Sequence, residues 1–166
     1  GAVRLWDLEH GSCHQELCGG PGVQCVAVDW SARIALCGGA INMKLWDLNR
    51  STCIREFSGQ RYVRCVAMDW AARLGISGGN DRTLRLWDLA TGKCIQEARG
   101  GAGCPTCMDV DWSSLYALCG CDDGSVRLWN LDSGALELLP VWEATAHTLV
   151  RDVALDWPGR RALTTG

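Results

Sequence analysis

The stretch SGGNDRTLRLWDL at residues 77–89 decides the fold, because its pattern returns one period along the chain. CGCDDGSVRLWNL at residues 119–131 has the same order of turn residues, alternating apolar residues and a closing Trp. The ending LWD also occurs twice earlier in the chain. The motif tryptophans are therefore Trp6, Trp46, Trp87 and Trp129. Their spacing of about 40 residues indicates a repeat architecture.

A second series of tryptophans is interleaved with the first. Each member closes the dipeptide DW, and the members are Trp30, Trp70, Trp112 and Trp157. Eight of the nine Trp residues thus belong to two series with the same period, and Trp142 stands outside them. We expect all eight indole rings to be buried where successive sheets stack.

Each period contains four short strand patterns separated by turn residues. In one unit they lie at residues 23–30, 33–37, 42–47 and 53–57. Four such strands form an antiparallel meander that cannot bury both of its faces alone, so neighbouring sheets must stack on it. Four strands per period of about 40 residues are typical of a propeller blade and not of a helical solenoid.

On these motifs the sequence resembles the WD40 family, and the resemblance covers nearly the whole chain. It implies an all-β fold of the propeller type, built from four-stranded antiparallel sheets. The repeat units are expected at about residues 1–39, 40–79, 80–121 and 122–166.

The order of the strand patterns places half a blade at each end of the sequence. The chain, which begins with Gly1, opens with the third and fourth strands of a blade at residues 2–17. It ends with the first and second strands of a blade at residues 150–166, after three whole blades. The two half-blades are complementary. They could close a four-bladed ring in one chain or an eight-bladed ring from two chains, or the chain could be part of a larger ring.

The resemblance also implies a hydrogen-bonded tetrad of His, Ser or Thr, Asp and Trp in each blade. The residues that match its polar positions are Ser77, Asp81, Asp123 and His147. The His position is otherwise held by Gly20, Gln60 and Ala102, and the Ser/Thr position by Cys37 and Cys119 and, in the last unit, by the matching Thr164. No blade written contiguously has all four family residues. We therefore expect cohesion to come mainly from packing, since partly satisfied polar networks are weak.

Composition and motifs favour a non-enzymatic protein. The net charge of −3 gives no reason to expect nucleic acid as a partner, and no apolar run is long enough for membrane insertion. The chain has neither the nucleophile elbow of a hydrolase nor a phosphate-binding loop. The sequence therefore predicts no cofactor and no catalytic residues.

Cysteine is abundant, with eleven residues, and most of them recur at the same repeat positions as small residues elsewhere. This pattern predicts free, buried thiols and an intracellular, reducing compartment. Cys104 and Cys107 have the C-x-x-C spacing, which leaves a redox or zinc site as an alternative. Since no second such pair or nearby His completes a zinc set, we predict no metal.

The segments that enter the innermost strand of each unit differ from one another, so the fold does not require their residues. They carry Arg61, Tyr62, Arg99 and Trp142, which are residue types enriched at binding hot spots. The resemblance places these segments on the rim of one face. We predict a protein–protein interaction scaffold that binds other proteins or peptides there. The alternative is a permanent structural subunit of a large assembly. Ring completion by a second copy or by missing blades is also possible.

Overall fold

The structure is a computed structural model. It describes residues 1–18, 20–132, 137–145 and 148–166, with residues 137–145 as backbone only. The described residues form β-strands that assemble into three four-stranded and two two-stranded antiparallel sheets. None of the described residues forms a helix that could cross a membrane.

Three of the sheets are whole blades, each with its strands hydrogen-bonded in sequence order. The first whole blade contains β3 (Cys25–Asp29), β4 (Ile34–Gly38), β5 (Met43–Asp47) and β6 (Thr52–Phe57). The second contains β7 (Val63–Asp69), β8 (Leu74–Gly79), β9 (Thr83–Asp88) and β10 (Cys94–Arg99). The third contains β11 (Pro105–Asp111), β12 (Tyr116–Cys121), β13 (Ser125–Asn130) and β14 (Glu137–Thr145).

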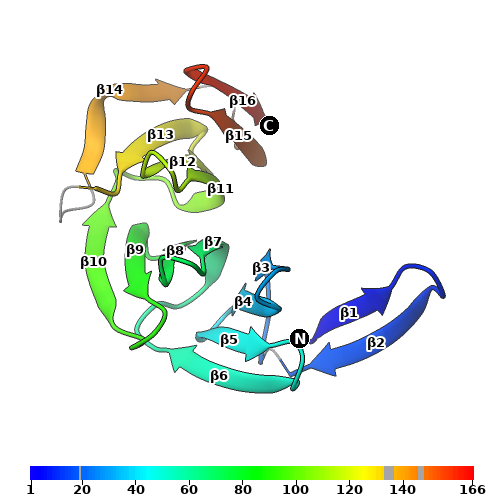
Figure 1. Cartoon of the computed structure of the whole chain (residues 1–166). Helices are drawn as coiled ribbons and strands as arrows, with labels where there is room; N and C mark the ends of the chain where they lie inside the picture. Colours follow the sequence, from blue (N-terminus) through cyan, green and yellow to red (C-terminus); the bar gives the residue numbers. More distant parts are fainter. Residues whose placement is uncertain (19, 133–136, 146–147) are drawn as a thin grey trace.

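The remaining sheets are half-blades at the two ends of the arc. The N-terminal half-blade consists of β1 (Val3–Asp7) and β2 (Ser12–Leu17), and the C-terminal half-blade of β15 (Asp152–Asp156) and β16 (Arg161–Thr165). Figure 1 shows the five sheets as an open arc, with β1–β2 and β15–β16 far apart at its ends. The all-β blade architecture predicted from the repeats is therefore confirmed, and the sheets do not close into a ring.

The aspartate of each DW dipeptide explains the tight turn after the first strand of a blade. Asp29 accepts a hydrogen bond from the backbone N–H of Ala32 at 2.9 Å, and Asp69 accepts one from Ala72 at 3.1 Å. The next residue then adopts a left-handed conformation, with φ of 58° at Arg33 and 59° at Arg73. Side-chain capping of this kind is the usual role of Asp in turns.

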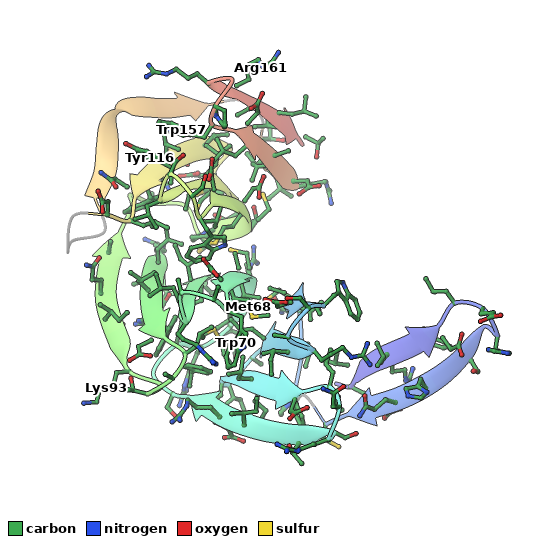
Figure 2. The ribbon with its side chains drawn as sticks, in the orientation of Figure 1. Met68, Trp70, Lys93, Tyr116, Trp157 and Arg161 are labelled. Carbon is green, nitrogen blue, oxygen red and sulfur yellow. The ribbon has the colours of Figure 1, made fainter. Side chains whose placement is uncertain are left out.

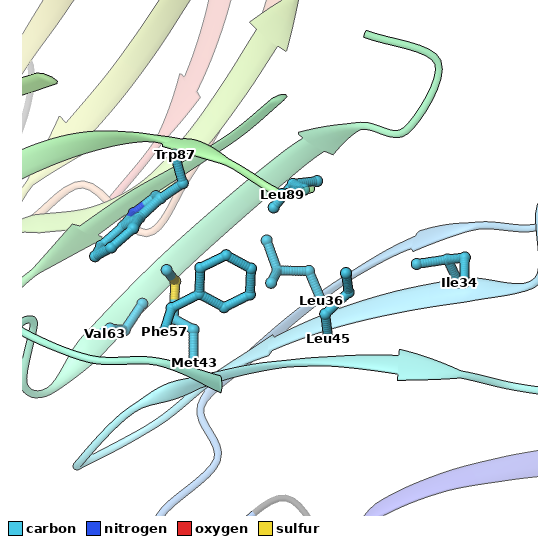
Figure 3. Close-up of a cluster of buried hydrophobic side chains, with 8 residues drawn as sticks. All are labelled: Ile34, Leu36, Met43, Leu45, Phe57, Val63, Trp87 and Leu89. Atoms are coloured by element: carbon cyan, nitrogen blue, oxygen red, sulfur yellow. The ribbon is translucent and has the colours of Figure 1, made fainter. Parts of the chain in front are cut away.

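Hydrophobic clusters between successive sheets hold the arc together. The cluster between the first and second whole blades joins Leu36, Met43 and Phe57 to Val63 and Trp87 (Figure 3). Equivalent clusters lie at the other three contacts between neighbouring sheets. Each sheet thus buries its faces against its neighbours, as a propeller requires.

The third-strand tryptophans are buried only where a preceding blade exists. Trp46, Trp87 and Trp129 are 2–6% exposed, because each packs against the blade before it. Trp6 has the same position on β1 but is 53% exposed, since no described sheet precedes the N-terminal half-blade. The expectation that this whole series is buried is therefore wrong for Trp6.

The DW tryptophans follow the same rule. Trp70 and Trp112 are half-buried against the preceding blade, and Trp157 stacks on Tyr116 with ring centroids 3.8 Å apart (Figure 2). Trp30 is 60% exposed. No described strand stands before Trp30 in the way that β4 stands before Trp70, so its expected burial is also wrong.

Candidate protein-interaction site

Loops from neighbouring blades are tied together on one face of the arc. Backbone hydrogen bonds run from Ala40 N–H to Pro21 O at 3.2 Å and from Tyr62 N–H to Ala40 O at 3.1 Å. They continue from Asn80 N–H to Tyr62 O at 3.1 Å. We call this surface the loop face; its residues are 20–24, 39–42, 58–62, 79–82, 100–104 and 121–124. These bonds across blade boundaries give the face a defined shape.

An open pocket of about 430 Å³ lies on the loop face where the first and second whole blades meet. It is lined by Ile41, Asn42, Gly59, Arg61 and Asp81. Its volume lies within the range of ligand-binding pockets. Sequence reasoning identified Arg61 but missed Ile41 and Asn42.

Large apolar side chains are exposed around this pocket. Ile41 is 51% exposed and Tyr62 is 52% exposed. Ile41 occupies the repeat position that holds Asp81 and Asp123 in the next two blades. That departure from the repeat was the signal in the sequence that could have identified Ile41.

The two charged residues of the pocket, Asp81 and Arg61, differ in whether other side chains of the protein pair with their charges. Asp81 accepts hydrogen bonds from the Thr83 hydroxyl at 2.7 Å and from Arg85 Nη1 at 2.8 Å. Burial alone would raise the pKa of Asp81, but hydrogen bonds from Thr83 and Gln60 hold that pKa below its usual value. No described carboxylate forms an ion pair with Arg61, which is exposed. The charge that the pocket offers a ligand is therefore the cation of Arg61.

A buried hydrogen-bond network lies directly beneath Arg61 and Tyr62. Gln60 Nε2 donates to Asp81 Oδ1 at 3.3 Å and to the Thr83 hydroxyl at 3.2 Å. Ser77 donates to Gln60 Oε1, and Trp87 Nε1 donates to Ser77 Oγ at 2.8 Å. No blade has all four family residues, but the second whole blade has a connected four-residue network with Gln60 at the His position. The Gln60 amide both donates and accepts, so it performs both functions of the family's His.

The corresponding networks of the other whole blades are incomplete. Cys37 and Cys119 replace Ser77 there, and the indole N–H groups of Trp46 and Trp129 have no hydrogen-bond partner among the described residues. Asp123 accepts from the Ser125 hydroxyl at 2.5 Å and from Arg127 at 3.1 Å. His147 lies outside the described residues. The tetrad is thus interrupted in the first and third whole blades.

Replacing Cys119 with Ser is expected to stabilise the chain by about 1 kcal/mol, which is the net value of a typical hydrogen bond. The hydroxyl would accept a bond from Trp129 Nε1, as Ser77 does from Trp87. Urea denaturation followed by Trp fluorescence measures the change. Cys119→Ala is the matched control, because it removes the thiol without supplying an acceptor. Equal stability of the two variants would contradict the prediction.

Two of the predicted binding residues do not lie in the loops where the sequence placed them. Arg99 is the last residue of the outermost strand β10, opposite Thr83 on β9, and it is exposed. The backbone of Trp142 belongs to β14, because that strand continues from Glu137 to Thr145 alongside β13. The structure thus brings Arg61 and Tyr62 together and leaves Arg99 and Trp142 on outermost strands.

The cysteines show no arrangement suited to redox or metal chemistry. All eleven are free, as predicted, but the expected burial is wrong for the four that are exposed: Cys13, Cys18, Cys53 and Cys94. Burial raises the pKa of Cys25 to about 12 and that of Cys37 to about 11. Burial and then Asp122 raise the pKa of Cys104, whereas a reactive thiol needs a lowered one. Among the described residues no group of three or more His, Cys, Asp or Glu side chains could hold a metal ion.

These features define the class of protein: an all-β chain of stacked four-stranded blades, arranged as an open part of a β-propeller. The family model "WD domain, G-beta repeat" matches residues 51–88 and 92–130. These two stretches of the chain are similar to WD40 repeats, and the whole chain is consistent with a run of such repeats. WD40 repeats generally serve as non-enzymatic scaffolds for protein–protein interaction.

A solved structure is also similar to this chain: the crystal structure of the computationally designed Ika4 protein. The two sequences are 22% identical, the match covers 84% of each chain, and the TM-score is 0.69. This likeness shows the shared fold. No curated protein sequence matches the chain.

Proposed function

We propose that this protein is a non-enzymatic interaction scaffold whose partner binds the loop face at the pocket between the first and second whole blades. One observation carries the proposal. Exposed Ile41 and Tyr62 stand beside the cation of Arg61, which forms no ion pair with any carboxylate that the structure describes, on loops that are bonded across the blade boundary. Exposed apolar and aromatic side chains next to an available Arg are typical of binding hot spots.

The chemistry of the pocket favours a protein segment with an apolar residue next to an acidic one. Ile41 and Tyr62 would contact the apolar side chain. Arg61 would bind the carboxylate, because Arg presents a fork of donors that matches a carboxylate. Asp81 forms an ion pair with Arg85, which also pairs with Glu97, and this pairing reduces the repulsion between Asp81 and such a ligand.

Removing the side chains of Arg61 and Tyr62 is expected to abolish partner binding and leave the fold intact. In the test, the tagged chain is crosslinked in a cell extract and the captured proteins are quantified by mass spectrometry. The variant that combines Arg61→Ala with Tyr62→Ala should no longer capture the specific partners. Capture of those partners by the unaltered chain should decrease as the salt concentration rises. Arg99→Ala is the matched control, because Arg99 is exposed on an outermost strand. If the double variant captures the same proteins as the unaltered chain, the loop face is not the binding site.

A permanent structural subunit is the second candidate, and exposed apolar side chains on the outermost strands favour it. Ile54 on β6 and Ile95 on β10 are 43% and 48% exposed, and obligate interfaces are the more hydrophobic kind. A partner held through these strands should stay bound in high salt and should be unaffected by the loop-face variants. The eleven free thiols support the further proposal that the chain works in a reducing compartment.

A further inference from the structure

The loop face has three carboxylates, and each is paired with an arginine of the chain. The pairs are Asp81 with Arg85 at 2.8 Å, Asp122 with Arg64 at 3.7 Å and Asp123 with Arg127 at 3.1 Å. The face also carries two exposed arginines, Arg61 and Arg82, and neither forms an ion pair with a carboxylate that the structure describes. Arg82 lies beside the Cys104 thiol, which burial keeps neutral by raising its pKa. The charge that the face offers to a partner is therefore positive and comes from these two arginines.

The turn that carries Arg82 adjoins the pocket of the proposed function. Asp81 lines that pocket, and Arg82 follows it directly in the chain. A Cβ atom at Gly79, at the start of the same turn, would lie 3.1 Å from the carbonyl oxygen of Tyr62 and 3.2 Å from that of Arg61. The two arginines therefore belong to segments that lie against each other beside one pocket.

Tyr62 and Arg82 also share an unusual backbone conformation. Their φ angles are 52° and 63°, in the left-handed region that is unfavourable for residues with a side chain. The equivalent residues of neighbouring blades are Gly22 and Gly124, with φ of 61° and 81°. The repeat therefore accepts glycine at both positions and does not require Tyr or Arg. Side chains that are kept in strained backbone occur often at functional sites.

We propose that the partner presents an extended segment with one apolar and two acidic residues, and that Arg61 and Arg82 each bind one of the two carboxylates. This inference rests on the proposed function, because the apolar residue occupies the pocket beside Ile41 and Tyr62. Backbone hydrogen bonds run from the turn of Ile41 to Tyr62 and from Tyr62 to the turn of Arg82. The loops thus follow one another in this order, so both acidic residues lie on the same side of the apolar one.

Two cations distinguish such a segment better than one. A single exposed ion pair changes a dissociation constant by no more than about fivefold. A second pair multiplies that effect, and the fork of donors on each arginine favours a carboxylate over a neutral amide. A segment with one acidic residue would leave Arg82 without a ligand. The contribution of Arg82 should also decrease as the salt concentration rises.

The probe is a displayed library of random short peptides that is selected on the purified chain. We expect the selected peptides to share an apolar residue with two Asp or Glu residues on one side of it. Fluorescence anisotropy of one selected peptide should give a dissociation constant about fivefold higher for Arg82→Ala and about tenfold or more higher for Arg82→Glu. Arg33→Ala is the matched control. Arg33 also has left-handed backbone, with φ of 58°, but it precedes β4, whose other end reaches the loop face.

A charge exchange tests which acidic residue meets Arg82. Replacing the second acidic residue of the peptide with Lys should restore binding to Arg82→Glu and should not restore it to Arg61→Glu. Circular dichroism checks that each variant stays folded. If Arg82→Glu binds the peptide as tightly as the unaltered chain, while Arg61→Ala and Tyr62→Ala weaken it, the pocket is the binding site and the inference about a second acidic residue is wrong. If neither Arg61→Ala nor Tyr62→Ala weakens binding, the proposed function itself fails.

Discussion

Replacing Trp87 with Ala is expected to lower the free energy of unfolding by about 3–5 kcal/mol, the usual range for a large core aromatic. The indole is 2% exposed and lies edge-to-face on Phe57, with ring centroids 5.7 Å apart. It also packs among Leu36, Met43 and Val63 of the cluster between the first two whole blades (Figure 3). Its loss leaves a cavity at a contact between blades. Since small proteins have only about 5–15 kcal/mol of stability in total, much of the chain should unfold at moderate urea.

Asp81→Ala is the comparison that tests whether packing outweighs polar contacts. This substitution removes acceptors for Thr83, Gln60 and Arg85. Water can partly replace those bonds because the Asp81 side chain is 31% exposed. The expected cost is about 1–2 kcal/mol. Urea denaturation curves of both variants, followed by circular dichroism, give the two values. If Asp81→Ala were the more damaging of the two, burial of Trp87 would not be the main source of cohesion.

The repeat pattern predicted the strands well because each strand and turn depends on residues close to it in the chain. The DW aspartates form their own turns, and the alternating segments around Trp46 and Trp87 form the third strands. Burial was less predictable, since it depends on what stands next to a residue in space. Trp6 and Trp46 occupy equal positions in the repeat, yet only Trp46 has a blade in front of it.

The candidate site was only half predictable for a related reason. Arg61 and Tyr62 could be identified because their loop differs between the repeat units, so the fold does not require its residues. Ile41 comes from the neighbouring blade, and no sequence pattern showed that its turn meets that loop across the blade boundary. Arg99 and Trp142 were assigned to loops because strands β10 and β14 extend further than the repeat pattern indicated. Strand length is set by pairing with the neighbour, which the sequence of one strand does not contain.

Gln60 shows how a missing family residue can still leave its function in place. From the sequence, this blade lacks one of the four family residues because the His position holds Gln. In the structure the amide donates to Asp81 and Thr83 and accepts from Ser77, and Ser77 in turn accepts from Trp87. The side chain is only 1% exposed, so no water is available to replace it. The network therefore depends on this one residue.

Gln60→Ala is expected to destabilise the chain by about 2–4 kcal/mol, because it leaves buried polar groups unsatisfied and opens a cavity. The loss should also loosen the adjoining Arg61–Tyr62 segment, which amide hydrogen exchange at Tyr62 and Asn80 would report as faster exchange. Gln60→His is the matched control. An imidazole can also donate to Asp81 and accept from Ser77, so its stability should stay within about 1 kcal/mol of the unaltered chain. If Gln60→Ala proved as stable as Gln60→His in urea, the amide would not be a working member of the network, and Trp87 and Ser77 would be held by packing alone.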